Sequence, residues 1–391
     1  MAGSALSWLQ YVLGLRALGH DVLYLEDAGG WFYDHLTLEM IRNVAIPVSH
    51  LSNLMNSFDL HESWTFVDEE RREYGLGGAR LRDFLSSADL LIHVTGAMSL
   101  KYDPAYMKIP VRAYVDTDPG FIQARVASGN KRDLEHLNDH TVHFSFGGNI
   151  GRKGCAVPAT GHDWRPTVQP IFLPLWSEQP VPPKGAPFTT IVKWDPGGHG
   201  PMPFKGRVLG AKHGEFAKFV TLPQHLNRPL EIAMAGRAPI ADLESFGWQC
   251  RSGPEVSSTI AVYQKYIRDS AGEWSVAKNA YVTLNTGWFS DRSAAYLASG
   301  RPVVLQSTGF KEWLPCGIGL LTFTTLAEAI EAIRAVDSAA ASHCRAARDL
   351  ALSHFESSVV LSRLIEICFG AQGSSIEFGA QGSSIENVTG P

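Results

Sequence analysis

The chain has 391 residues, of which 45% are hydrophobic and 19% charged, so it is long enough for two globular domains. Its formal net charge of −5 gives no support for nucleic-acid binding, which requires clustered positive charge. No run reaches the ~18 apolar residues of a membrane span, and five scattered cysteines indicate a reducing compartment, so we expect a cytoplasmic protein without an integral membrane segment.

The N-terminal part opens with an expected helix at residues 4–18, which Gly19 ends before a strand at 21–25. A domain built on a parallel sheet normally opens with a strand, so either upstream residues were lost or this sheet is built without its first strand. Residues 28–78 are rich in aromatic side chains and histidines. These suit stacking on a flat ligand, or equally a satellite core beneath a long loop.

Polar residues then follow two apolar strands expected at 90–94 and 111–115. Such strands are typical of a parallel sheet that gathers its ligands at the carboxyl ends. His93, Asp116 and Asp118 fall on this edge, where an imidazole or a carboxylate can act as a general base. Alternatively, one of the two aspartates caps a helix at 119–126. The glycine run at 147–151 indicates a tight turn, although glycines also let a backbone approach a ligand.

A proline-rich stretch at 166–187 favours an extended linker between two domains. The second domain opens with a strand at 189–194, and its loop at 195–200 should face the ligand. Lys212 stands before a helix expected at 215–221 and could neutralise an anion, although a solvated surface lysine is the alternative interpretation. Gly236 follows a further buried strand, at 229–235.

The stretch at 272–306 predicts a strand (273–277), a loop (279–289), a helix (290–299) ended by Gly300, and a second strand (302–306). Ser290 is a natural N-cap, and the amides of the helix start can hold an anion that Lys278 and Arg292 would flank. The same layout occurs in any α/β unit, so a purely structural explanation stays open. The residues at the helix start are Trp288, Phe289, Ser290 and Asp291.

The segment GWFSDRSAAYLASGRPVV, from Gly287 to Val304, resembles the nucleotide-sugar-binding signature of GT-B glycosyltransferases, in particular the bacterial spore-coat-type group. The resemblance extends over most of the chain from Leu9 to Cys368, although the sequence has Gly287 and Ala295 where many retaining members carry glutamates. Asp291 is the nearest acid. Four further stretches carry the resemblance: HDVLYLED (20–27), VRAYVDTDP (111–119), FSFGGNIG (144–151) and TTIVKWD (189–195).

This resemblance implies an α/β protein with two Rossmann-like domains facing across a cleft. The expected parts are an acceptor domain (1–165), the linker (166–187), a nucleotide-sugar-binding domain (188–355), a crossing helix (356–369) and a tail (370–391). The tail contains a perfect repeat, FGAQGSSIE, and we expect it to be disordered.

The implied activity is metal-independent transfer of a sugar from a nucleoside-diphosphate sugar to a small-molecule or glycan acceptor, with no other cofactor. His93, Asp116 and Asp118 are then candidates for catalysis. The donor diphosphate would be held by Lys212, Gly236, Lys278, Arg292 and the helix start at 288–291. An epimerase or hydrolase on the same scaffold and a catalytically idle binding protein are the alternatives. A dehydrogenase is disfavoured, since no GxGxxG follows an early strand.

Overall fold

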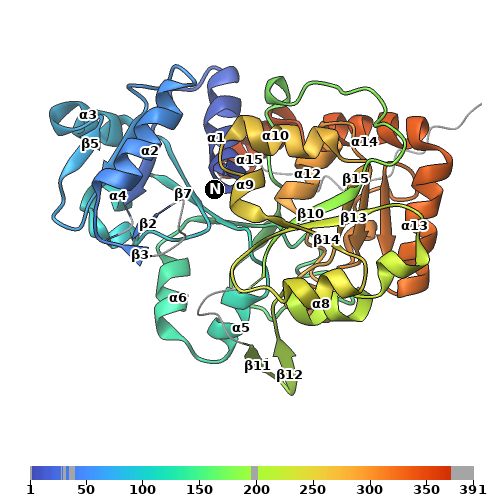
Figure 1. Cartoon of the computed structure of the whole chain (residues 1–391). Helices are drawn as coiled ribbons and strands as arrows, with labels where there is room; N and C mark the ends of the chain where they lie inside the picture. Colours follow the sequence, from blue (N-terminus) through green and yellow to red (C-terminus); the bar gives the residue numbers. More distant parts are fainter. Residues whose placement is uncertain (1, 28, 30–31, 35–39, 195–200, 371–391) are drawn as a thin grey trace, which may run out of the picture.

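The computed structural model describes residues 2–27, 29, 32–34, 40–194 and 201–370, which form two α/β halves side by side (Figure 1). The predicted loop at 195–200 and the repeat tail at 371–391 lie outside the described residues. Within the described part, no helix is long and apolar enough to cross a membrane. Both halves contain parallel sheets, so the predicted α/β class is confirmed.

The N-terminal half contains a four-stranded parallel sheet in the order β6-β7-β8-β9. As the sequence predicts, the apolar stretches of β6 and β7 are followed by polar residues at their carboxyl ends. Two helices that follow β7 cover it: α5 (Phe121–Ala127) and α6 (Lys131–Asn138). The strands are β6 (Leu90–Val94), β7 (Val111–Asp116), β8 (Val142–Ser145) and β9 (Trp164–Pro166).

A second sheet in this half has the order β1-β4-β5, so β1 and β6 each lie at an edge of a separate sheet. In residues 2–27 the first element is helix α1, and no strand precedes β1. Leu23, Leu25 and Leu91 pack in one cluster and so fill the space between the two edges with side chains. The remaining elements are α1 (Ala2–Ala17), β1 (Tyr24–Asp27), β2 (Phe32–Tyr33), β3 (Met40–Ile41), α2 (Ala45–Asn56), β4 (Trp64–Val67), β5 (Glu73–Gly75), α3 (Gly78–Ser87) and α4 (Pro104–Lys108).

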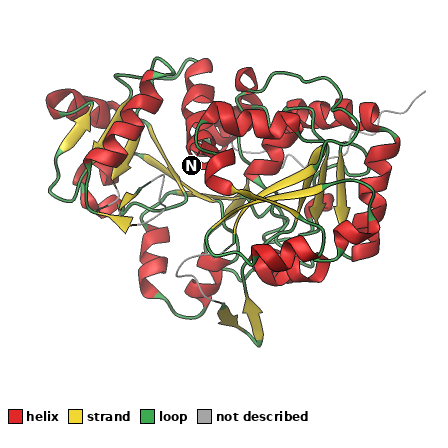
Figure 2. Cartoon of the chain, viewed as in Figure 1, coloured by secondary structure: helices red, strands yellow, loops and turns green. Residues whose placement is uncertain are grey.

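The C-terminal half is built on a six-stranded parallel sheet in the order β14-β13-β10-β15-β16-β17. This order reverses between β10 and β15, which is where ligands of such sheets bind. Helices cover both faces (Figure 2). The strands are β10 (Phe188–Lys193), β13 (Leu230–Ala235), β14 (Gln249–Ser252), β15 (Gly272–Ser275), β16 (Val303–Gln306) and β17 (Leu320–Phe323), with a hairpin of β11 (Met202–Phe204) and β12 (Arg207–Leu209).

The helices of this half are α7 (Lys212–Phe216), α8 (Ile240–Ser245), α9 (Gly253–Val256), α10 (Ile260–Asp269), α11 (Asn279–Leu284), α12 (Asp291–Ala298), α13 (Leu326–Ser338), α14 (Ala340–His354) and α15 (Ser357–Phe369). The last of them, α15, packs against α1 and β7 of the other half. At one point this contact leaves no room for a side chain, since a Cβ on Gly14 would lie 2.6 Å from Leu361. The chain end thus ties the two halves together, as expected for a crossing helix.

Two local expectations about secondary structure are wrong. Residues 279–284 form α11 rather than a loop. Helix α5 is not capped by an aspartate; its N-cap is Gly120, whose N–H donates to Gln123 Oε1 at 2.7 Å. The Gln123 side chain thus accepts from the N–H of the N-cap residue, which is not the bond to the first-turn amides that an aspartate cap would make.

Candidate active site between the two halves

An ion pair joins the strand ends of the two halves. Asp118 lies two residues after β7, and Lys278 lies three residues after β15. The Lys278 Nζ is 2.7 Å from Asp118 Oδ1 and 2.6 Å from Oδ2, and the Tyr281 hydroxyl of α11 also donates to Asp118. The carboxyl ends of β7 and β15 therefore meet at one place.

Lys212, the first residue of α7, lies beside this ion pair. Its Nζ is 5.7 Å from the centre of the Trp288 ring. Burial lowers the pKa of Lys212 to about 7, with the positive charges of Arg292 and Lys278 acting in the same direction and the Glu273 carboxylate opposing them. The amine consequently gains or loses a proton near neutral pH, and a bound anion would favour its charged form.

Arg292, on the first turn of α12, is held by the C-terminal sheet. Its Nε donates to Glu273 Oε1 at 2.5 Å, while its other nitrogens donate to the Ile191 carbonyl at 2.5 Å and to Ser275 Oγ at 2.8 Å. Burial alone would lower the pKa of Arg292, but the Glu273 carboxylate raises it. Arg292 is therefore a fixed cation with a buried counter-charge, and its expected contact with the donor stays a prediction.

The start of α12 differs in detail from the predicted cap. Ser290 is the N-cap residue and is buried, but its side chain makes no capping bond; its Oγ lies 3.4 Å from Asp291 Oδ1. Asp291 Oδ2 accepts from Ser7 Oγ of α1 at 3.0 Å. The Asp291 carboxylate is thus turned toward the N-terminal helix and serves as a link between the halves.

The two aromatic residues before this helix have different surroundings. The Trp288 ring lies 4.5 Å from the Tyr281 ring, centre to centre, and its Nε1 donates to the Thr117 carbonyl at 3.2 Å. The Phe289 ring is buried in the core against Phe310 and Phe355. The Phe289 side chain is therefore out of reach of a ligand, and this residue could contact one only through its backbone.

The two aspartates after β7 have distinct environments. Asp116 is 4% exposed; its Oδ2 accepts from Gln123 Nε2 and Ser145 Oγ, and its Oδ1 accepts from the Asp118 N–H. Burial raises the pKa of Asp116 to about 6. Asp116 therefore shapes the loop, whereas the Asp118 side chain, 46% exposed, is the one that solvent and ligands can reach.

Two further predicted site residues, His93 and Gly236, make no contact with the Asp118–Lys278 ion pair. His93 Nδ1 is 2.9 Å from His140 Nε2, and the Met98 N–H donates to His93 Nε2 at 3.2 Å. Burial lowers the pKa of His93 to about 3. Gly236 is exposed after β13 with a φ of 87°.

A tight backbone contact between the halves was not foreseen from the sequence. Asn149, in the glycine run, donates from Nδ2 to the Gly309 carbonyl at 3.1 Å. Gly287 has a φ of 73°, and a Cβ there would lie 2.8 Å from the Asn149 backbone nitrogen. Position 287 therefore cannot hold the glutamate of the retaining pattern, and the glycine run was the only sequence signal for this contact.

A narrow pocket opens beside Lys212, between the carboxyl ends of β10, β13 and β15. It encloses about 10 Å³, which is room for about one water molecule. Its walls combine the Lys212 ammonium with aromatic side chains, so Lys212 is the cationic group that an anion in this pocket would contact. The lining residues are Thr190, Val192, Trp194, Lys212, His213, Phe216, Ile232, Trp274, Ser275 and Val276.

No family model matches the sequence, and no curated protein matches it. Solved structures do match. The Anabaena protein Alr3699/HepE in complex with UDP-glucose has a TM-score of 0.54 at 12% identity, over 88% of this chain and 98% of that chain. The sucrose-phosphate synthase of Thermosynechococcus elongatus matches with a TM-score of 0.51 at 13% identity, over 93% of this chain and 92% of that chain. AviGT4, a glycosyltransferase of avilamycin A biosynthesis, matches with a TM-score of 0.51 at 11% identity, over 92% of this chain and 87% of that chain.

The chain spans only 60% of TarM and 61% of a chain of the GtfA/B complex, two larger proteins with TM-scores of 0.45 and 0.47. At these identities the likeness concerns the path of the chain and not its chemistry. The two α/β halves, the sheet order and the matches to Alr3699/HepE, the sucrose-phosphate synthase and AviGT4 agree: the protein has the GT-B fold.

Proposed function

We propose that the protein transfers a sugar from a nucleoside-diphosphate sugar, with uridine as the base, to an acceptor hydroxyl. The observation that carries this proposal is the ion pair of Lys278 and Asp118 at the strand ends of the two halves, with Lys212 near enough for the Lys278 charge to lower its pKa. The same fold holds UDP-glucose in Alr3699/HepE. Two ammonium groups at a sheet's switch point suit a diphosphate, whose departure requires neutralised charge.

The proposed reaction follows from the same contacts. The donor diphosphate displaces the Asp118 carboxylate from Lys278 and gains Lys212 as a second partner. The acceptor oxygen then bonds to the anomeric carbon while the bond from that carbon to the diphosphate oxygen breaks. Asp118, released from its ion pair, takes the acceptor proton. Charge is neutralised by side chains and the α12 start, so we propose that no metal is required.

The test is a binding and turnover comparison of Lys278→Ala, Lys212→Ala and Lys184→Ala. Lys184 is an exposed lysine in the linker and serves as the control for loss of one positive charge. We expect UDP binding by calorimetry to weaken at least tenfold in the first two variants only, because each loses a direct charge partner of the diphosphate. Unchanged UDP affinity in both would overturn the proposal.

A catalytically idle nucleotide-sugar-binding protein is the second candidate, because position 287 cannot hold an acidic side chain. It predicts that UDP-glucose binds with the same dependence on Lys278, yet no UDP is released with any acceptor. Release of UDP with no acceptor present would instead point to a hydrolase, and a changed sugar on the intact donor to an epimerase. Product analysis of one reaction series therefore separates the four outcomes.

A further inference from the structure

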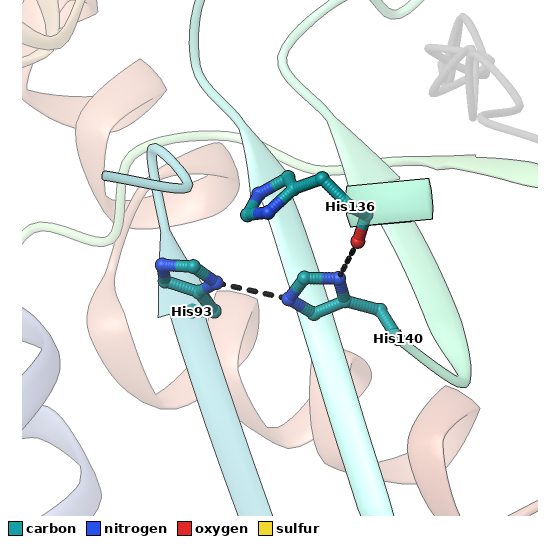
Figure 3. A group of neighbouring side chains, drawn as sticks. All are labelled: His93, His136 and His140. Carbon is teal, nitrogen blue, oxygen red and sulfur yellow. Dashed lines mark hydrogen bonds between the residues drawn. The ribbon is translucent and has the colours of Figure 1, made fainter. Parts of the chain in front are cut away.

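We propose that His93, His136 and His140 bind one divalent transition-metal ion, with Zn²⁺ as the ion tested. Each of the three side chains offers one ring nitrogen, and these nitrogens all lie within 4.8 Å of one another (Figure 3). The nitrogens around a tetrahedral zinc ion, with bonds of about 2.0–2.1 Å, are ~3.4 Å apart. Small rotations of the three rings would therefore be enough to close the site.

The elements hold the three histidines in place. His93 is on β6, His136 is on the last turn of α6, and His140 follows two residues after α6 ends. The centres of the His136 and His140 rings are 5.2 Å apart, and they lie 5.6 Å and 5.1 Å from the centre of the His93 ring. Figure 3 shows the three rings facing a common space between the strand and the helix.

The hydrogen bonds around His140 prepare it as a ligand. Its Nδ1 lies 2.8 Å from the His136 carbonyl oxygen, so it donates its proton there. The Nε2 lone pair, which now faces His93 Nδ1 at 2.9 Å, is the one that a metal ion would take. Metal-binding histidines commonly have their other nitrogen fixed in this way by a backbone carbonyl. The His140 ring is also buried, 5% exposed, and a neutral imidazole is the form that binds a metal.

His136 supplies an orphaned atom. Its Nε2 is buried and has no hydrogen-bond partner among the described residues. Gly96 packs closely against it, because a Cβ at that position would lie 2.9 Å from His136 Nε2 and closer still to the Tyr114 ring. A buried polar atom without a partner costs free energy, and a metal ion would remove that cost.

His93 must change its protonation. At present the Met98 N–H donates to Nε2, so Nδ1 carries the proton and donates it to His140 Nε2. A metal bound at Nδ1 displaces this proton, which moves to Nε2, and the Met98 N–H then loses its acceptor. The Met98 amide is therefore a reporter of metal binding. An all-imidazole site favours Zn²⁺ or its neighbours over Mg²⁺, which prefers oxygen.

The metal site uses neither the two lysines nor the aspartate of the proposed transfer reaction. The two proposals can therefore be tested independently. Its effect would be structural: one ion would tie β6, α6 and the segment leading into β8. Three protein ligands leave the fourth tetrahedral position to water.

The experiment uses the full chain without a polyhistidine tag, freed of metal by chelation. We expect one equivalent of Zn²⁺ by calorimetry, a Co²⁺ absorption spectrum of a tetrahedral site, a shifted Met98 amide resonance and no effect of Mg²⁺. His136→Gln and His140→Gln should weaken Zn²⁺ binding at least tenfold. His162→Gln is the matched control, because His162 lies beside the cluster but bonds to Thr160 and Asn138.

Equal Zn²⁺ affinity in His136→Gln and the unchanged protein, or a dissociation constant weaker than about 1 mM, would overturn the proposal, since a three-histidine site should bind far tighter. If the variants fail to fold, anomalous diffraction from Zn²⁺-soaked crystals of the unchanged protein decides. A peak within about 2.3 Å of the three nitrogens supports the site, and its absence rejects it.

Discussion

Asp118 and Lys278 are 160 residues apart in the chain, yet their side chains form the ion pair that joins the strand ends of the two halves. Both side chains are partly exposed, 46% for Asp118 and 34% for Lys278. An ion pair of this exposure contributes little to stability, about 0–1 kcal/mol. It can therefore be exchanged for a contact with a ligand at small cost.

Removing the charge of Asp118 separates binding from catalysis. In Asp118→Asn we expect UDP to bind a few-fold more tightly, because Lys278 no longer has a competing carboxylate. Sugar transfer should fall by ~100-fold or more, since the general base is lost. Calorimetry and a UDP-release assay measure the two effects. Unchanged turnover would show that Asp118 is not the base.

Lys212 makes donor binding depend on pH. Its folded-state pKa of about 7 is below the ordinary value of 10.5. A diphosphate favours the charged amine, so binding at pH 8 should take up a proton, and UDP affinity should fall as the pH rises above 7. Calorimetry at pH 8 in buffers of different ionisation enthalpy measures the uptake, which should vanish in Lys212→Met.

The same pKa shift has a consequence for stability. Because the pKa is lowered in the folded protein, charged Lys212 costs stability in full below pH 7. The cost declines between pH 7 and 10.5, where the folded amine is neutral and the unfolded one is still protonated. The gain in stability of Lys212→Met over the unchanged protein should therefore be largest at or below pH 7. Urea titrations from pH 6 to 9 check this direction.

Position 287 requires glycine for two reasons: its φ is positive, and Asn149 lies where a side chain would begin. We expect Gly287→Ala to destabilise the protein by ~2–4 kcal/mol, since it adds a clash with Asn149 to a positive φ. Gly185→Ala is the matched control: its φ is 89°, but nothing lies within 4 Å of a Cβ there. That variant should lose only ~1 kcal/mol. Equal losses in urea unfolding would contradict the role of Asn149.

Glu273 balances the buried charge of Arg292. Glu273→Gln should destabilise by ~3–5 kcal/mol, because it leaves the guanidinium buried without its counter-charge. Glu331→Gln is the control, since Glu331 is 72% exposed and its partner Arg334 is 58% exposed, and we expect a loss within ~1 kcal/mol. Thermal unfolding of both variants at pH 7 distinguishes a buried ion pair from a surface one.

Much of the local structure could be predicted from the sequence. Helix α15 begins within one residue of the helix expected at 356–369 and ends at the same residue, and Gly300 adopts the left-handed conformation, with a φ of 66°. The pairing of side chains could not be predicted. Asp291 was expected near an anion but contacts Ser7, which is 284 residues away in sequence. Asp118 was a candidate cap or base, and nothing local indicated Lys278 as its partner.

The sequence by itself determined the two α/β halves, the strand ends where polar residues gather, and the helix start at Ser290. These follow from apolar periodicity and from glycine and capping residues, which act over a few neighbouring positions. Only the tertiary structure decided which side chains meet: Lys278 with Asp118, Arg292 with Glu273, and His93 with His140. Those contacts depend on strand order and on the packing of the halves, which bring together residues that local patterns cannot relate.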